Sequence, residues 1–307
     1  MRNNFAAAFH EAAGQDPRLC LLVADISPAG SIQAFREAYP DRFINTGVAE
    51  QVMIGMAAGM AMRGLRPFAY TIAPFALYRP FEMIRVDLAY QNLPVTVVGI
   101  GGGVTYSVLG GTHHAQEDVA IACAVPNMAV IAPCDPLETR EATKWCAGQE
   151  RGPVYLRLGK AGEPDLTSQT SEPFVFGKLR FLTKGSDVAV LSYGPILKMG
   201  AEIANRFRQE GTSVSLISAH TLKPFDTEGV ADLLANCRRV VVIEEMVPHG
   251  GLADRVKVLA WERKATCRID TFTLDDAFHH RYGTHAELLA VHGLELERIW
   301  QSLKQDS

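Results

Sequence analysis

The chain has 307 residues, of which 48% are hydrophobic and 21% are charged. Those proportions are ordinary for a folded protein, so they exclude a mainly disordered chain, and the length suggests two domains. Lysine and arginine number 30 against 34 aspartate and glutamate, a net charge of −4 that gives no sign of a nucleic-acid partner. We also expect no membrane partner, because no apolar run reaches the roughly 18 residues of a membrane-spanning helix.

Six cysteines are spread along the chain without the close spacing of a metal site or a disulfide framework. They are Cys20, Cys123, Cys134, Cys146, Cys237 and Cys267. The chain does not open with a basic region followed by an apolar stretch, as a secretory signal would. We therefore expect reduced thiols, mostly buried, in a cytoplasmic protein.

In the first half of the chain, apolar runs alternate with helical patterns, which is typical of an α/β protein with a mainly parallel sheet. Runs that predict buried strands lie at Leu19–Ala24, Pro67–Ile72, Val95–Ile100, Asn127–Ile131 and Val154–Leu158. Helices are predicted at Arg2–Ala13, Glu50–Met62 and Pro136–Cys146.

A polar segment, Gly162–Gly185, separates this half from a second alternation. It contains Pro164, Pro173 and a stretch rich in serine and threonine, which are features of exposed connections. Beyond it, strands are predicted at Asp187–Ser192, Val214–Ile217, Val240–Glu244 and Cys267–Phe272. Helices are predicted at Ile196–Gln209, Thr227–Leu234, Leu252–Trp261 and from His285 onward. We expect two three-layer α/β/α domains with mainly parallel sheets, at 1–165 and 187–307, joined by a linker over 166–186.

The segment Asn45–Gln51 joins a short apolar strand to an apolar helix. Gly47 suits a tight turn, and Glu50 falls in the first turn of the helix, where the helix macrodipole favours a carboxylate whatever its function. No further charged residue follows before Arg63, so we expect this carboxylate to be partly desolvated. At the carboxyl end of a strand, where α/β sheets bind ligands, it could share a proton with a ligand nitrogen.

Aromatic residues then recur three apart at Phe75, Tyr78 and Phe81, which would place them on one face of a helix starting after Pro74. Such a stripe usually belongs to a core. The functional alternative is a platform on which a flat heteroaromatic ring stacks.

A third motif, Gly110–Asp118 (GGTHHAQED), places two adjacent histidines in a glycine-rich loop. Histidines in such a loop can transfer protons near neutral pH. His113, His114, Glu117 and Asp118 could also bind a metal ion, but their spacing is not that of two histidines on one helix face. A metal site is therefore the weaker interpretation of this motif.

In this order and spacing, the three motifs resemble the transketolase family of thiamine diphosphate enzymes. The similarity is to the C-terminal half of such enzymes, a pyrimidine-binding domain followed by a transketolase C-terminal domain, and it covers nearly the whole chain. Later segments are also similar: Val188–Gly194, Thr221–Thr227, and Val240–Glu245 with the HGG that follows. The resemblance implies a transferase that moves a two-carbon ketol unit from a ketose donor to an aldose acceptor.

The resemblance also implies which residues bind the cofactor, thiamine diphosphate. Glu50 matches the glutamate that hydrogen-bonds N1′ of the aminopyrimidine ring and so takes part in catalysis. Phe75 matches the aromatic residue that stacks on this ring, and Tyr78 and Phe81 match its supporting wall. Asp25, in the sequence ADISP, matches an acidic residue of the family's ADLTPS-like segment.

For the substrate, His113 matches the family's catalytic histidine, which faces the reacting carbons and moves protons, and His114 adjoins it. Arg2 matches an arginine that binds the phosphate of a sugar phosphate. Lys160 stands at the position of a second such arginine, within the segment that starts at Arg157. Lysine still attracts phosphate as a point charge, but without the two-pronged geometry of arginine.

Besides Lys160, three further positions depart from the family pattern. Leu109 replaces an aspartate associated with reading a substrate hydroxyl, and Gly101 falls near a family histidine. Ala29 replaces a phosphate-binding serine. These changes indicate that the substrate is not the usual unmodified sugar phosphate.

The sequence contains no GDG motif with the later asparagine that holds Mg²⁺ and the diphosphate in this family. The chain begins at the pyrimidine-binding domain, which indicates a split transketolase. The resemblance then implies a partner subunit that carries that motif and holds Mg²⁺, with the cofactor between the two chains of an α2β2 assembly. Because the partner would hold Mg²⁺, the resemblance implies no metal ligand in this chain.

Three alternatives remain open at this point. One is the matching half of a 1-deoxyxylulose-5-phosphate synthase-like enzyme, and another is the beta subunit of a 2-oxo acid dehydrogenase. The sequence around His113 favours a transketolase or a synthase over the dehydrogenase. The third is a non-catalytic regulatory or structural subunit, which Glu50 argues against.

Overall fold

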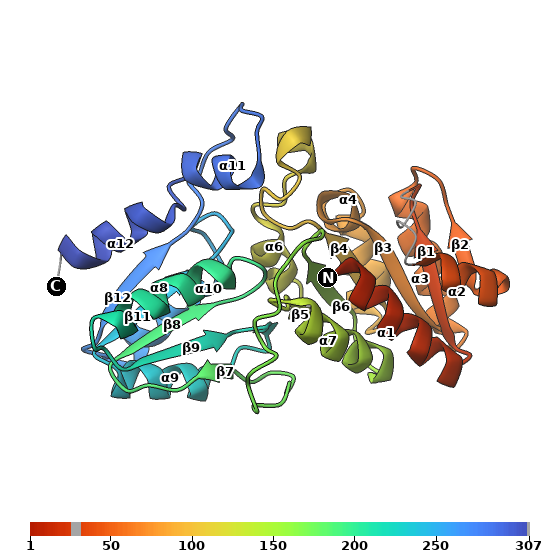
Figure 1. Cartoon of the computed structure of the whole chain (residues 1–307). Coiled ribbons are helices and arrows are strands. Elements are labelled where there is room, and N and C mark those ends of the chain that lie inside the picture. Colours follow the sequence, from red (N-terminus) through yellow and green to blue (C-terminus); the bar gives the residue numbers. More distant parts are fainter. Residues whose placement is uncertain (26–31, 306–307) are drawn as a thin grey trace.

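A computed structural model describes residues 1–25 and 32–305 of the chain. Two sheets lie side by side, the N-terminal one carrying α1 and α7 and the C-terminal one carrying α8 to α12 (Figure 1). The predicted positions Ser27, Pro28 and Ala29 lie outside the described residues. Within the described part of the chain, no helix is both long enough and apolar enough to cross a membrane.

The strands are β1 (Leu19–Val23), β2 (Phe43–Asn45), β3 (Arg66–Ile72), β4 (Thr96–Ile100), β5 (Ala129–Ile131), β6 (Val154–Leu158), β7 (Arg180–Thr183), β8 (Val188–Ser192), β9 (Val214–Ser218), β10 (Thr221–Lys223), β11 (Arg239–Ile243) and β12 (Arg268–Phe272). The α-helices are α1 (Arg2–Gln15), α2 (Gln33–Ala38), α3 (Glu50–Met62), α4 (Ala73–Leu77), α5 (Phe81–Met83), α6 (Asp118–Ala124), α7 (Pro136–Gly148), α8 (Leu197–Gln209), α9 (Thr227–Asn236), α10 (Leu252–Arg263), α11 (His285–Val291) and α12 (Leu296–Gln305). The segment η3 (Ile84–Tyr90) is a π-helix, and short 3₁₀ turns are η2 (Pro40–Arg42), η4 (Ser107–Leu109) and η5 (Gly111–His113).

The first sheet has seven strands in the order β10-β5-β6-β4-β3-β1-β2, all parallel except β10. The second has five in the order β12-β11-β8-β9-β7, all parallel except β7. Helices cover both faces of each sheet. Parallel strands such as β1, β4 and β8 are therefore buried along their whole length. The predicted fold class, two mainly parallel three-layer α/β units, is confirmed.

The apolar core crosses from one sheet to the other. One buried cluster contains Ile54 of α3, Leu88 of η3, Val230 of α9 and Val256 of α10, so both units share it. Two further clusters fill the outer faces, one around α1 and α7 and the other around α8 and α12. The two units therefore pack against each other through a shared apolar core.

Two short strands differ from the sequence predictions. Residues 166–186 were predicted to be a linker, but β7 lies within them and pairs antiparallel with β9. The second, β10, belongs to the C-terminal half of the chain and yet adds an antiparallel edge to β5 of the first sheet. Both have only three or four residues and carry polar side chains, so neither forms the apolar run that signals a strand.

The glycine-rich turn after β4 has a steric origin. Gly101 has φ +74° and Gly103 has φ +64°, a region that favours glycine. A Cβ added at Gly101 would collide with the ring of Tyr106, and one at Gly103 would collide with Glu245. At Gly101, near the family histidine position, the adjacent space is therefore filled by Tyr106.

Gly101→Ala should lower the free energy of unfolding by about 1–3 kcal/mol, because it adds both backbone strain and the collision with Tyr106. Gly55→Ala is the matched control, since Gly55 lies on an exposed helix face with open space around it. That control should be neutral or stabilising by up to about 1 kcal/mol. Urea unfolding of both variants tests this, and equal free energies would contradict the steric account.

Candidate active site

The site is built around Glu50 at the start of α3. The chain leaves β2, turns at Gly47 with φ +67°, and enters the helix at Glu50. Although it is charged, Glu50 is only 2% exposed. Arg79 donates from Nη1 to both carboxylate oxygens, at 2.9 and 3.0 Å. The free amides of the first helical turn also favour this negative charge.

Arg79 makes a second contact, with Phe75 of α4. Its guanidinium carbon lies 4.1 Å from the centre of the Phe75 ring. The imidazole of His113 approaches the same phenyl ring edge-on, with ring centres 5.0 Å apart. Burial and then the nearby Arg79 charge lower the pKa of His113, so its ring is neutral at neutral pH and can accept a proton. Arg79 thus links Glu50 to Phe75, and His113 contacts the same ring, while the catalytic and cofactor roles of these residues stay predictions.

The pairing of Arg79 tests whether a cofactor ring fits here. A guanidinium is a planar N–H donor, and this one both stacks on Phe75 and donates to Glu50. An aminopyrimidine ring is also planar and would make these two contacts with the same residues. The Arg79 side chain is 41% exposed, so it has room to turn into solvent and leave the place free. The residues present therefore fit the ring of thiamine diphosphate.

The three aromatic residues do not share one helical face, which corrects that part of the sequence prediction. The helix α4 ends at Leu77, a turn follows over 78–80, and α5 begins at Phe81. Tyr78 and Phe81 pack against the central core, and the Tyr78 hydroxyl is 3.0 Å from Oε2 of Glu117. Burial, with the nearby acidic groups, raises the pKa of Tyr78. Proline at position 80 explains the break, because its ring prevents the helix from continuing. The cofactor-binding roles of Tyr78 and Phe81 stay predictions.

Two of the predicted basic residues lie together beside this site. Arg2 donates from Nε to the carbonyl oxygen of Lys160 at 2.8 Å. The Lys160 ammonium lies 4.9 Å from the centre of the Tyr106 ring, and that ring centre is 6.3 Å from His113. Tyr106 thus lies between the basic pair and the histidine, and the substrate roles of Arg2 and Lys160 stay predictions.

The remaining predicted site residues, Arg157, His114 and Asp25, lie in different places. Arg157 is buried beneath the glycine-rich turn, where it pairs with Asp118 at 2.8 Å and donates to the carbonyl oxygen of Glu245. His114 is also buried, and its Nε2 has no hydrogen-bond partner among the described residues. Asp25 is exposed, and its backbone amide donates to Asn45 at the end of β2. The substrate and cofactor roles of Arg157, His114 and Asp25 stay predictions.

Family models match almost the whole chain. One described as the transketolase pyrimidine-binding domain matches residues 1–162, and one described as the transketolase C-terminal domain matches residues 177–299. The chain belongs to the transketolase family. The resemblance inferred from the sequence motifs is thereby confirmed.

Individual relatives agree with this assignment. The chain is 30% identical over 298 residues to a subunit of the apulose-4-phosphate transketolase of Phocaeicola vulgatus, covering 97% of this chain and 94% of that one. It is 32% identical to 1-deoxy-D-xylulose-5-phosphate synthase of Symbiobacterium thermophilum, covering 94% of this chain but only 44% of the synthase. A solved split-gene transketolase, described as an inactive beta4 tetramer, matches with a TM-score of 0.88 at 32% identity, covering 99% and 97% of the two chains.

Several residues at this transketolase-family site escaped the sequence analysis. Arg79 is 29 residues from Glu50 in the chain, and only the fold joins them. In the sequence, only its position directly after Tyr78 of the aromatic motif could have indicated that Arg79 lies near the site. Glu245 and His285 form another pair, at 2.7 Å, and Glu245 also accepts from the amide of Val104. No local sequence motif predicts the Glu50–Arg79 pair or the Glu245–His285 pair.

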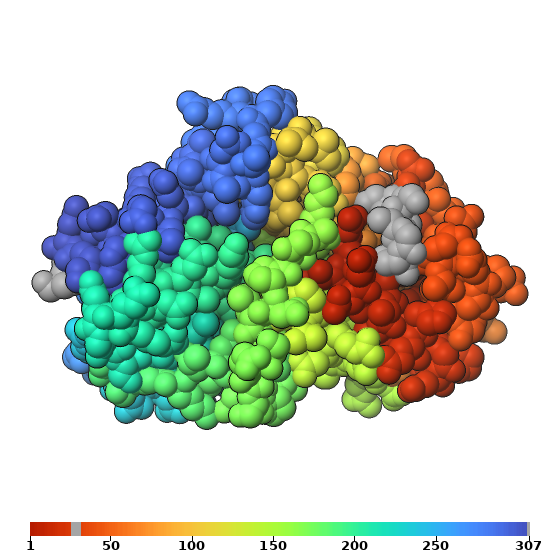
Figure 2. All heavy atoms as spheres, viewed as in Figure 1, coloured from red at the N-terminus to blue at the C-terminus, as the bar shows by residue number. Residues whose placement is uncertain are grey.

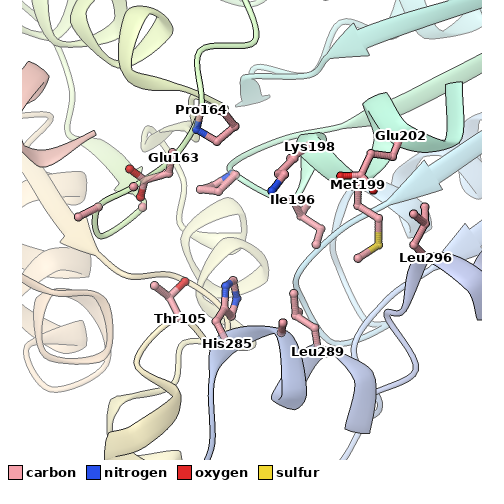
Figure 3. A pocket seen from close by; sticks show the side chains of 15 residues that line it. Thr105, Glu163, Pro164, Ile196, Lys198, Met199, Glu202, His285, Leu289 and Leu296 are labelled. Carbon is pink, nitrogen blue, oxygen red and sulfur yellow. The ribbon is translucent and has the colours of Figure 1, made fainter. Parts of the chain in front are cut away.

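His285 also lines a cavity of about 330 Å³ between the two units (Figure 3). Thr105 and Glu163 reach it from the first unit, and Lys198, Met199 and Glu202 reach it from α8 of the second. Burial alone would lower the pKa of His285, but the Glu245 carboxylate outweighs it and raises that pKa. The same contact lowers the pKa of Glu245 despite its burial. The two shifts agree that the charged pair is favoured.

Replacing Arg79 tests the central ion pair. Arg79→Met should lower the free energy of unfolding by about 1–2 kcal/mol, because the buried Glu50 carboxylate loses its charged partner. Glu50→Gln in the same background should recover most of that loss, and Arg85→Met is the control at another arginine nearby in the chain. Urea unfolding at pH 7 checks this. An unchanged free energy in Arg79→Met would show that the pair does not stabilise the fold.

The Glu245–His285 pair predicts a pH dependence. A histidine whose pKa is raised on folding stabilises most below its unfolded pKa of about 6.5, and this stabilisation is lost as pH rises through the folded value. The free energy of unfolding should therefore fall more steeply above about pH 6 in the wild type than in His285→Gln. A slope in His285→Gln equal to that of the wild type would contradict this account.

Proposed function

We propose that this chain is one subunit of a split, thiamine diphosphate-dependent transketolase. The assembled enzyme transfers a two-carbon ketol unit from a ketose donor to an aldose acceptor. The observation that carries the proposal is the buried Glu50 carboxylate beside Phe75, with a planar N–H donor already between them. The similarity to a protein named as one subunit of a transketolase supports it.

The chain's own residues would act on the cofactor ring and the substrate. When bound, thiamine diphosphate supplies the electron sink for carbon–carbon bond cleavage. Glu50 would hold a proton at the ring nitrogen that faces it, and Phe75 would fix the plane of the ring. Neutral His113, at the edge of Phe75, would move protons at the substrate.

The partner subunit would cover the exposed face of α3. This face carries Val48 just before the helix, 70% exposed, Val52, 54% exposed, and Met62, 59% exposed. Gly55 and Gly59 lie on the same face, and an added Cβ at either would meet nothing within 4 Å. An apolar face with small residues suits close packing by another protein, and Glu50 begins the same helix. The diphosphate and Mg²⁺ would then be held by that partner, an N-terminal-type subunit, in an α2β2 assembly.

The substrate would be a sugar or sugar phosphate with an unusual hydroxyl pattern. Arg2 and Lys160 would attract its anionic end, at the Tyr106 side of His113. Leu109, at the position of a family aspartate, is 45% exposed and cannot hydrogen-bond a hydroxyl. The hydrogen bond that the family aspartate would make to a substrate hydroxyl would therefore be replaced by an apolar contact with Leu109.

Reconstitution tests the proposed function. The chain would be mixed with a candidate partner that carries the GDG and asparagine motif, with thiamine diphosphate, Mg²⁺ and a panel of ketoses and aldoses. Products would be identified by mass spectrometry. We expect ketol transfer from the pair and none from either subunit alone. Turnover by this chain alone would contradict the split-subunit proposal, and pyruvate decarboxylation without ketol transfer would favour the synthase-like alternative.

Two surface variants test the proposed partner interface, one on the α3 face and one as a control on α10. Val52→Asp places a charge on the α3 face and should prevent assembly, whereas Val258→Asp changes an equally exposed valine on α10 and should leave it intact. Analytical ultracentrifugation of each mixture measures the outcome. Assembly of Val52→Asp with wild-type affinity would show that the partner packs elsewhere.

A further inference from the structure

A cluster of three metal-ligating side chains lies in the C-terminal unit, apart from Glu50 and Phe75. Asp275 follows β12, His279 lies in the loop before α11, and His292 ends that helix. A carboxylate oxygen of Asp275 and one imidazole nitrogen from each histidine all lie within 4.8 Å of one another. The residues are four and thirteen apart in the sequence, so no short motif reveals them.

The internal contacts of the cluster leave one imidazole nitrogen without a partner among the described residues. His279 lies with Nε2 at 3.3 Å from Oδ2 of Asp275, and its ring meets the ring of His292 edge-on, with centres 4.4 Å apart. His292 is only 2% exposed, and its buried Nδ1 has no hydrogen-bond partner among the described residues. A buried imidazole nitrogen normally has a partner, so this atom itself points to a missing ligand.

We propose that Asp275, His279 and His292 form a zinc site. Two imidazole nitrogens with one carboxylate oxygen are a donor set that suits Zn²⁺, and three protein ligands leave a fourth tetrahedral position for water. The ion would replace the direct contact between Asp275 and His279 and satisfy the buried Nδ1 of His292. This site is separate from the Mg²⁺ expected in the partner subunit.

The zinc site would stabilise one wall beside the active-site loop. His279 lines a cavity of about 410 Å³ together with Phe278, Tyr282 and, from the first unit, Leu109 and His114. A Cβ added at Gly110 would lie 3.1 Å from the Tyr282 ring, so the two loops are in close contact. In Figure 2 the loop before α11 and the segment around Gly110 adjoin on the surface. Fixing Asp275 and His279 to the end of α11 would therefore hold the loop before α11 next to the loop that carries His113 and His114.

Metal titration of the complete chain tests the proposal without any need for catalysis. The protein would be stripped with EDTA, transferred to chelator-free buffer and titrated with ZnCl₂ by calorimetry. Co²⁺ would serve as a spectroscopic probe, since tetrahedral cobalt has distinct visible bands. We expect one high-affinity site per chain, a tetrahedral Co²⁺ spectrum, and a rise in Tm on adding Zn²⁺.

His279→Ala and Asp275→Asn should each weaken Zn²⁺ binding more than about 10-fold and abolish the rise in Tm. Both residues lie at or near the surface, and circular dichroism would check that the variants fold. His280→Ala is the matched control, because His280 is the next residue and is exposed outside the cluster. It should bind Zn²⁺ as the wild type does. Binding that is absent from the wild type, or equal in His279→Ala and wild type, would overturn the proposal.

Discussion

The arrangement of the active site depends on one buried charge, the Glu50 carboxylate at the first turn of α3. Burying a carboxylate is costly unless a partner and hydrogen bonds compensate for it. Here the helix N-terminus and Arg79 provide that compensation, and Arg79 rests in turn on Phe75. The ion pair thus offsets the cost of burying the carboxylate, and in the proposed complex a ligand N–H would take the place of the guanidinium.

A second network holds the loop that faces this charge. Beneath the glycine-rich turn after β4, Arg157 joins Asp118 of α6 to the carbonyl oxygen of Glu245 in the second unit. Glu245 also binds the amide of Val104 and the ring of His285. The loop with His113 is therefore attached to both units by buried charged contacts. Such contacts lose much more when one partner is removed than they contribute as a pair, so they specify one arrangement.

The sequence was sufficient to predict features that depend on local patterns. The helix Glu50–Met62 was predicted with the bounds that α3 has, and the long apolar strands were found because parallel strands are apolar throughout. The edge strands β7 and β10 were missed because they are short and polar. The aromatic residues after Pro74 were wrongly placed on one face, since Pro80 interrupts the helix between Tyr78 and Phe81. Arg79 could not be paired with Glu50 from sequence, because only the packing of α5 and η3 against α3 brings the turn that carries Arg79 to the start of that helix.

The central claim is that Glu50 holds a proton at the ring nitrogen of the cofactor in the assembled enzyme. Hydrogen–deuterium exchange at C2 of bound thiamine diphosphate, followed by acid quench and proton NMR, tests it most directly. At equal cofactor occupancy, the complex containing Glu50→Gln should exchange at least about 100-fold more slowly than the wild-type complex. Exchange at the wild-type rate in that variant would contradict the account.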